Sequence, residues 1–494
     1  MEGYAEYRAT TFLDGLCREN NKDGCNEGGR VRETPMRRKT TGKIERSLNE
    51  LYRDDPERAE ALAFGRKTGT SRRGFLEGAG LAAFGAAVGG AVPFSGNIPS
   101  GLFPAAFAQG TPPAAAPAPA PAPERKGPQL LNFPGKDGNL VVLGERPLVA
   151  ETPESLLNDE VTPVNKFFIR NNGQIPETAR NADAWKITID GEVNKKLELS
   201  LGEIKKRFKP VTRRMVLECG GNGRSFFSPP ARGNQWTNGG IGCAEWTGVR
   251  LADVLKAAGL KSSAVFTANF GADPSLSGEP GRQALSRGVP IKKALEEHNL
   301  IVWAMNGKPL DLIHGFPARL VIPGWPGSVS EKWLTRIWIR DKVHDGVGMG
   351  GTSYRVAVRS MVPGDRPDEK NFRDLESMPV RSIVTSPANG TKLAAGTRQL
   401  NLRGAAWNGD YGVRAVHVST DYGSSWQAAK LARPTNKYDW TRWTATVRLP
   451  SDGYYEIWSR ATDSRGIAQP HIAGFWNPQG YGANPVNRIS VLVA

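Results

Sequence analysis

One cysteine of this chain stands where a metal-binding or nucleophilic thiolate would be placed. The stretch RRMVLECGGNGRSFF, residues 213–227, sets Cys219 between an apolar run and a glycine-rich loop, and Arg224 follows the loop. The run Met215 to Leu217 predicts a strand that delivers the cysteine at its end. Glycines let a bulky group approach the backbone, and a nearby guanidinium favours the thiolate, which binds soft metals or attacks electrophiles. Taken alone, such a cysteine is more often a buried apolar residue.

The wider sequence decides between these interpretations. The motif ECGGNGR resembles the cysteine motif of the sulfite oxidase family of molybdenum enzymes, and other segments resemble that family in the same order and spacing over nearly all of residues 150–494. These segments are TPVNKFFIRN (162–171), EWTGVRL (245–251), AMNGKPL (304–310), HGFPARLVIPG (314–324) and EKWLTRI (331–337).

The resemblance implies a molybdenum–molybdopterin cofactor and assigns residues to it. Cys219 would ligate molybdenum, with further sulfurs from the dithiolene of the pterin. Arg170 and Arg224 match substrate-pocket arginines, and Arg442 in DWTRW is expected to be a third, from the C-terminal domain. A planar guanidinium binds an oxyanion through paired charge-assisted hydrogen bonds. The residues expected to hold the pterin and its phosphate are Phe168, Arg170, Asn172, Asp273, Arg287, His314, Arg319, Ser330 and Lys332.

Two positions depart from the family pattern. Asn172 stands where the family usually has histidine, and Leu285 stands where it usually has a tyrosine, five residues before Pro290. Arg287, two residues after Leu285, is a candidate to supply pocket charge instead. Both changes leave the substrate open between sulfite and a related sulfur species.

The elements that position these residues follow from periodicity. Trp185 to Val193 alternates like a strand, and Leu251 to Ala258 repeats like one face of a helix that Gly259 closes. Pro290 suits the first turn of a helix through Glu297. Leu300 to Met305 then reads as a strand ending in an Asn-Gly hairpin signal. We therefore predict an α+β catalytic domain over residues 130–378.

From residue 379 onward the pattern changes to short alternating runs separated by Gly, Asp and Asn. Such spacing predicts an immunoglobulin-like antiparallel β-sandwich over residues 379–494. This part also resembles the dimerisation domain of the sulfite oxidase family, through DYGSSWQAAKL (421–431) and FWNPQGYGANPVNRISVLV (475–493). A homodimer is expected on that basis.

The N-terminal part predicts export. Residues 70–94 carry a twin arginine followed by a short run rich in Gly and Ala, which is typical of a Tat signal peptide and too weakly apolar for a convincing membrane span. Ala106 to Ala108 offers a cleavage site, so residues 1–108 are interpreted as the leader and 109–129 as a Pro/Ala-rich linker. Folded export is typical of proteins that acquire a cofactor in the cytoplasm. A periplasmic protein is expected.

The composition of the chain limits the classes of binding partner and cofactor that we expect. The net charge of +16 favours anionic partners, but the basic residues are dispersed, so nucleic acid is not expected. No C-x-x-C-H motif is present, and no haem is expected in this chain. Cys243 has no obvious partner and is expected to be a buried free thiol.

The leading hypothesis is a periplasmic sulfite dehydrogenase that passes electrons to a c-type cytochrome. The alternatives are a sulfane dehydrogenase-like subunit of a thiosulfate-oxidising complex, a sulfoxide reductase of the same family, and a cofactor-free anion-binding protein.

Overall fold

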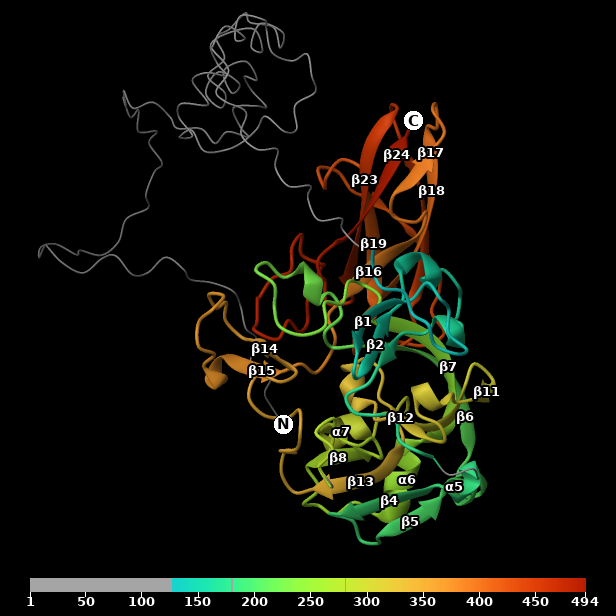
Figure 1. Cartoon of the computed structure of the whole chain (residues 1–494), viewed down its shortest axis with the longest axis vertical. Helices are drawn as coiled ribbons and strands as arrows, with labels where there is room; N and C mark the ends of the chain where they lie inside the picture. The colour runs from blue at the N-terminus through green and yellow to red at the C-terminus, as the bar shows by residue number, and fades with distance from the viewer. Residues whose placement is uncertain (1–126, 179–180, 280) are drawn as a thin grey trace, which may run out of the picture. The chain divides into compact units, whose positions relative to one another are not determined.

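A computed structural model describes residues 127–178, 181–279 and 281–494 (Figure 1), and residues 124–494 form one compact unit. The expected export signal, its cleavage site and the linker up to residue 126 lie outside the described residues. Within those ranges, no helix is both long and apolar enough to cross a membrane.

The predicted catalytic part is built on two five-stranded sheets and a small three-stranded sheet. The sheet that bears the cysteine runs β11–β10–β7–β6 with β12 beside β10; its strands are β6 (Pro210–Glu218), β7 (Ile241–Arg250), β10 (Leu300–Met305), β11 (Lys308–Pro309) and β12 (Arg319–Val321). The second sheet contains β4 (Lys186–Gly191), β5 (Leu197–Ser200), β8 (Phe266–Gly271), β9 (Ser286–Arg287) and β13 (Leu334–Arg340). The third contains β1 (Val141–Glu145), β2 (Leu148–Glu151) and β3 (Ile169–Arg170).

Three short helices accompany these sheets, and local sequence explains their limits. Helix α5 (Leu201–Arg207) begins with a capping box in which Ser200 and Glu203 satisfy each other's backbone N–H groups. Helix α6 (Leu251–Ala258) presents the predicted apolar face to the core, and Gly259 ends it with a φ of +71°.

Helix α7 (Ile291–Ala294) is shorter than predicted, with Pro290 at its N-cap. The side chain of Asn299 donates to the Lys293 carbonyl, which a longer helix would have used for its own backbone. The predicted strand that follows is confirmed as β10, and Asn306 and Gly307, both at positive φ, turn it into β11.

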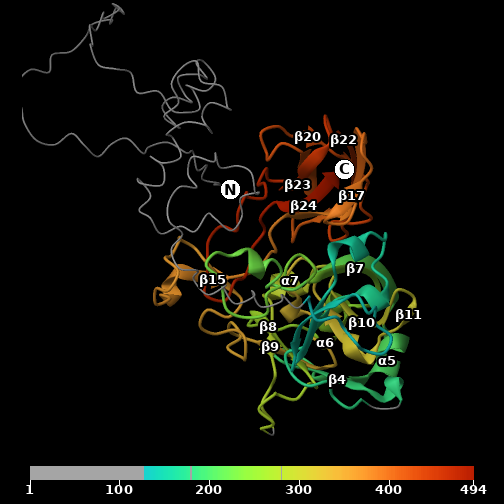
Figure 2. The ribbon, with the colours of Figure 1, turned by 45° about the horizontal axis from the view of Figure 1, so that its top comes forward.

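The C-terminal part is the predicted sandwich. One sheet contains β16 (Arg381–Ser386), β18 (Gln399–Trp407), β21 (Lys430–Leu431) and β22 (Thr441–Arg448). The other contains β17 (Thr391–Leu393), β19 (Val413–Ser419), β20 (Gln427–Ala428), β23 (Gly453–Asp463) and β24 (Asn487–Val493). Apolar side chains from both sheets share one core, including Leu402, Val416, Trp443 and Ile457. All pairs are antiparallel except β17 with β24, and Figure 2 shows β23 beside β24.

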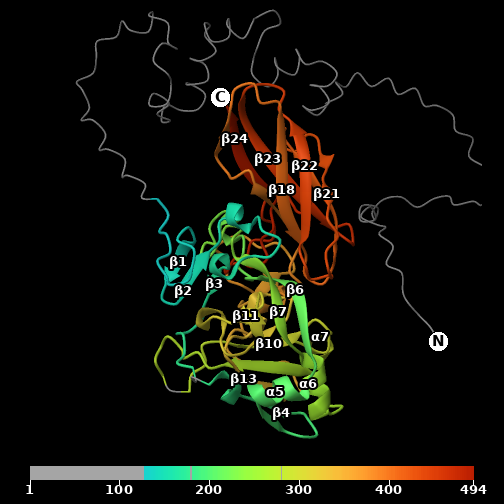
Figure 3. The same ribbon diagram turned by 90° about the vertical axis from the view of Figure 1, so that its right-hand side faces the viewer.

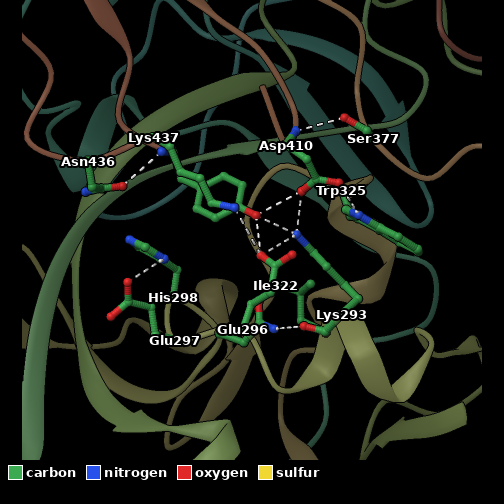
Figure 4. Close-up of polar contacts among 12 residues, drawn as sticks. Lys293, Glu296, Glu297, His298, Ile322, Trp325, Ser377, Asp410, Asn436 and Lys437 are labelled. Atoms are coloured by element: carbon green, nitrogen blue, oxygen red, sulfur yellow. Dashed lines mark hydrogen bonds and ion pairs between the residues drawn. The ribbon is translucent and has the colours of Figure 1, made fainter. Parts of the chain in front are cut away.

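The sandwich strands gather at one end of the described unit, and β4 and β13 lie at the other (Figure 3). Two ion-pair systems, each with a buried cation, connect the sandwich with the cysteine-bearing part. In the first, Lys293 of α7 lies 2.6 Å from Asp410 Oδ1, 2.7 Å from Tyr438 Oη and 3.2 Å from Glu296 Oε2 (Figure 4). We call these four residues the lysine clamp.

Candidate active site

Cys219 follows β6 directly, as predicted, and is only 8% exposed. Its N–H donates to the Gly240 carbonyl, 2.8 Å away, which fixes the start of the glycine-rich loop against the residue that precedes β7. A Cβ on Gly220 would lie 3.1 Å from Pro326 and 3.5 Å from the ring of Tyr354. The loop therefore needs glycine at this position for close packing around the thiol.

The second ion-pair system joins Glu218, at the end of β6, to Arg381 of β16 and stabilises this loop. Glu218 lies 3.5 Å from Arg381 of β16 and accepts hydrogen bonds from Asn222 Nδ2 and from Trp407 Nε1. Arg381 in turn donates to the Asn222 carbonyl at 2.9 Å. Sequence reasoning missed this support, although a carboxylate that ends an apolar strand run was a visible signal.

The thiol opens into a cavity that gathers most of the predicted site. Of the residues assigned from the sequence, Phe168, Arg170, Asn172, Cys219, His314, Arg319 and Lys332 line it. The remaining lining residues were not predicted: Phe167, Leu217, Gly220, Gly327, Ser328 and Tyr354.

One side of the cavity is crowded with cationic groups. Lys136 Nζ lies 2.7 Å from His314 Nε2, and burial lowers the pKa of Lys136 to about 7. Burial, with Lys136 and Lys332 nearby, lowers the pKa of His314 well below its usual value, so this histidine is neutral at pH 7. Burial also lowers the pKa of Arg319 to about 10 and that of Lys332 well below its normal range. Lys136 is a further member of the site that sequence analysis missed.

Two predicted cofactor residues lie behind the cavity wall. Ser330 does not line it: its hydroxyl accepts from the Ile322 N–H at 2.9 Å, and its carbonyl accepts from Arg319 Nη2 at 2.9 Å. Asp273 is buried as well, and burial raises its carboxyl pKa while Lys332 lowers it. In the described structure both residues support lining side chains.

Arg224 and Arg287 are buried beside the cavity but do not line it. Arg224 Nε donates to the Gln479 carbonyl at 2.7 Å, and Nη1 donates to the Asn234 carbonyl at 2.9 Å. Arg287 Nη1 donates to Ser328 Oγ at 2.7 Å, which places its charge directly behind a lining residue.

The assignment of Arg442 to the pocket is wrong in this structure. Strand β22 pairs Arg442 with Ala405, and the guanidinium donates to the carbonyls of Leu157 at 3.1 Å and Asn158 at 2.9 Å. The position of Arg442 on β22 therefore directs its side chain to these two carbonyls and away from the cavity. Cys243, in contrast, is a fully buried free thiol as expected, and it donates to Asp439 at 3.4 Å.

The cavity residues fit an anionic, phosphate-bearing cofactor. Arg319 Nε is buried with no hydrogen-bond partner among the described residues. Within the same ranges, none of Lys136, Arg170, Arg319 and Lys332 forms a salt bridge. Enclosed charges without a counter-ion are costly, so a bound phosphate would satisfy this set.

Two family models and several known proteins are similar to this chain. The family described as "Oxidoreductase molybdopterin binding domain" matches residues 172–347, and "Mo-co oxidoreductase dimerisation domain" matches residues 373–494. The chain is 32% identical to sulfite oxidase of Gallus gallus over 358 residues, which is 70% of this chain and 76% of that protein. It is 31% identical to mitochondrial sulfite oxidase of Drosophila melanogaster over 381 residues, covering 73% of this chain but only 64% of that protein's length.

A solved structure is also similar. The sulfane dehydrogenase SoxCD from Paracoccus pantotrophus aligns with a TM-score of 0.60 and 25% sequence identity, covering 79% of this chain and 99% of that chain.

Proposed function

This chain belongs to the sulfite oxidase family of molybdenum enzymes, and from that premise we propose that it oxidises sulfite to sulfate at a molybdenum–molybdopterin centre. The observation that carries the proposal is the meeting of Cys219, Arg170 and the unpaired cationic groups in one cavity. When bound, the cofactor would supply a metal that accepts two electrons from sulfite while water provides the added oxygen and releases two protons.

The residues of the chain would hold and orient the reactants. The Cys219 thiolate is the soft ligand for the metal. Arg319, Lys332 and Lys136 would neutralise the pterin phosphate, and neutral His314 would contribute a hydrogen bond at the same end. Arg170, which lines the cavity with Cys219, would orient the substrate oxyanion and stabilise the charge that develops during reaction.

A sulfite-dependent ferricyanide reduction assay tests the proposal. The native protein should carry about one molybdenum per chain, and Cys219→Ser should lose more than about 100-fold in rate, the upper end for groups that merely support a metal ligand. Cys243→Ala, which removes the other buried thiol, should retain activity. Full activity in Cys219→Ser, or no molybdenum in the native protein, would contradict the proposal.

A second candidate is oxidation of a sulfane sulfur carried on another protein. The structural similarity to a sulfane dehydrogenase favours it, and Asn172 and Leu285 are departures at the substrate side. Comparison of free sulfite with a carrier-bound sulfane, at equal concentration, separates the two: the true substrate should give the larger kcat/KM.

We further propose that the protein is exported folded to the periplasm, forms a homodimer and reduces a c-type cytochrome there. The twin-arginine segment at residues 70–94, the match to a dimerisation domain and the net charge of +16 support these three steps. With an acidic cytochrome as acceptor, kcat/KM should fall as ionic strength rises, because screening weakens electrostatic steering. Ferricyanide at saturating concentration provides the control for salt effects on the chemical step.

A further inference from the structure

Tyr354 has an unusual backbone conformation at the edge of the cavity. It directly precedes β14 (Arg355–Ala357), which pairs with β15 (Phe372–Asp374), and its φ is +51°. A bulky residue in the left-handed region is strained by about 1 kcal/mol or more. Such strain persists only where surrounding contacts hold it, so the position of this side chain is strongly determined.

The Tyr354 side chain belongs to the cavity wall beside Cys219. The residue is 8% exposed, lines the cavity and packs its ring against Gly220. Among the described residues its hydroxyl forms no hydrogen bond, and the hydroxyl is not one of the completely buried polar atoms that lack a partner. A tyrosine hydroxyl that is mostly buried normally has a partner. This one is free to take its partner from the cavity contents.

Two groups pack against the ring of Tyr354. The Arg287 guanidinium lies 4.3 Å from the ring centroid, and the Tyr481 ring stacks 4.8 Å away at an interplanar angle of 23°. Arg224 lies 5.2 Å from the Tyr481 ring, and Leu285 packs in the same apolar cluster. The stack keeps the hydroxyl in one place, and the cation–π contact stabilises the buried Arg287, which forms no salt bridge with any described residue.

We propose that the Tyr354 hydroxyl donates a hydrogen bond to the oxyanion that occupies the cavity, and that Arg287 and Tyr481 act as positioning residues for it. A phenol is a neutral donor, so it binds an anion without adding charge to an already cationic wall. The identity of the oxyanion as sulfite or sulfate rests on the function proposed above. The hydrogen bond itself rests on the geometry of Tyr354.

The test compares Tyr354→Phe with Tyr455→Phe in the molybdenum-loaded protein. Both changes delete one hydroxyl and keep the ring, but Tyr455 lies in the sandwich, where its hydroxyl donates to the Ser451 carbonyl. We expect Tyr354→Phe to lower kcat/KM for sulfite, per bound molybdenum, by roughly 10- to 100-fold, the range for a hydrogen bond to a charged group. Sulfate affinity, measured by calorimetry, should weaken by about tenfold or more. Tyr455→Phe should match the native protein in both measurements.

Sulfate affinity separates this inference from the proposed function. If the native protein fails to oxidise sulfite but binds sulfate in a Tyr354-dependent way, the function is wrong and the inference stands. Equal sulfate affinity in native and Tyr354→Phe proteins, or none in either, overturns the inference whatever the rate.

Discussion

Lys293 and Lys332 are both enclosed lysines, yet their surroundings differ completely. Lys293, in the lysine clamp, has two carboxylates and a phenol within 3.2 Å. Lys332, at the cavity, donates hydrogen bonds to the carbonyl of Ile313 and the side-chain oxygen of Asn171, lies 4.4 Å from the centroid of the Trp333 ring, and forms no salt bridge among the described residues. A cation that carries its own counter-ions is structural. A cation that forms no ion pair within the chain is available to bind the anion of a ligand.

The same contrast separates the arginines. Arg381 has Glu218 at 3.5 Å and holds the cysteine loop against the sandwich, whereas Arg319 has a buried Nε without a hydrogen-bond partner in the described part of the chain. Desolvation lowers the pKa of Arg319 and Lys332, and the nearby Glu331 and Asp273 offset this only in part. Without a bound anion, the enclosed cations at the cofactor end of the cavity therefore destabilise the fold. The cations at the interface with the sandwich do not, because they are paired with carboxylates. Four substitutions test this difference between paired and unpaired cations.

Lys293→Met should give the largest effect. It leaves Asp410 and Glu296 without their shared cation, and loss of one member of a buried ion pair costs about 3 kcal/mol or more in unfolding free energy. Lys292→Met, a change of the exposed neighbouring lysine, is the matched control. Denaturant unfolding measures both, and equal stabilities would show that the clamp is not structural.

Lys332→Met should have the opposite profile. We expect roughly 10- to 100-fold weaker retention of molybdenum and pterin, because a charged hydrogen bond to the phosphate is lost. The cofactor-free variant should stay within about 1 kcal/mol of the native protein, since removal of an unpaired charge offsets the lost hydrogen bonds. Molybdenum content after dialysis and unfolding of the cofactor-free forms are the measurements. A large loss of unfolding free energy would show instead that Lys332 is a structural residue, as Lys293 is.

Lys136→Met should change the pH dependence of the cofactor-free protein. The native pKa of Lys136, about 7, lies below the ordinary value of 10.5. Between these values the unfolded chain binds the extra proton, so this group makes stability rise with pH. Relative to the variant, the native protein should gain about 2 kcal/mol from pH 7 to pH 9. Lys308→Met, at an exposed strand position, should show no such difference from native.

Arg442→Met should have the smallest effect on the chemistry. Its guanidinium is committed to the carbonyls of Leu157 and Asn158. We expect the KM for sulfite to change by less than about twofold, within the range of substitutions away from a site. Steady-state kinetics with ferricyanide check this, and a KM raised tenfold would restore Arg442 to the substrate pocket.

Local sequence was sufficient for several elements. The Met215 to Leu217 run, the helix face closed by Gly259 and the Asn306–Gly307 turn each depend on neighbours in the chain, and all three formed as predicted. The length of helix α7 was overestimated, because the Lys293 carbonyl accepts from the Glu296 N–H of a tight turn and from the side chain of Asn299. A periodic pattern does not reveal such a capping contact.

The amino-acid sequence was enough to identify the cysteine, its strand and glycine loop, and the family that these motifs indicate, because order and spacing along the chain carry that information. Which charges remain unpaired could be seen only in the folded chain. Pairing depends on residues distant in sequence: Glu218 meets Arg381, Lys293 meets Asp410, and Arg442 turns to Leu157. Folding also brought Tyr354 to Cys219, which lies more than a hundred residues earlier, since packing in space rather than chain order sets the wall of the cavity.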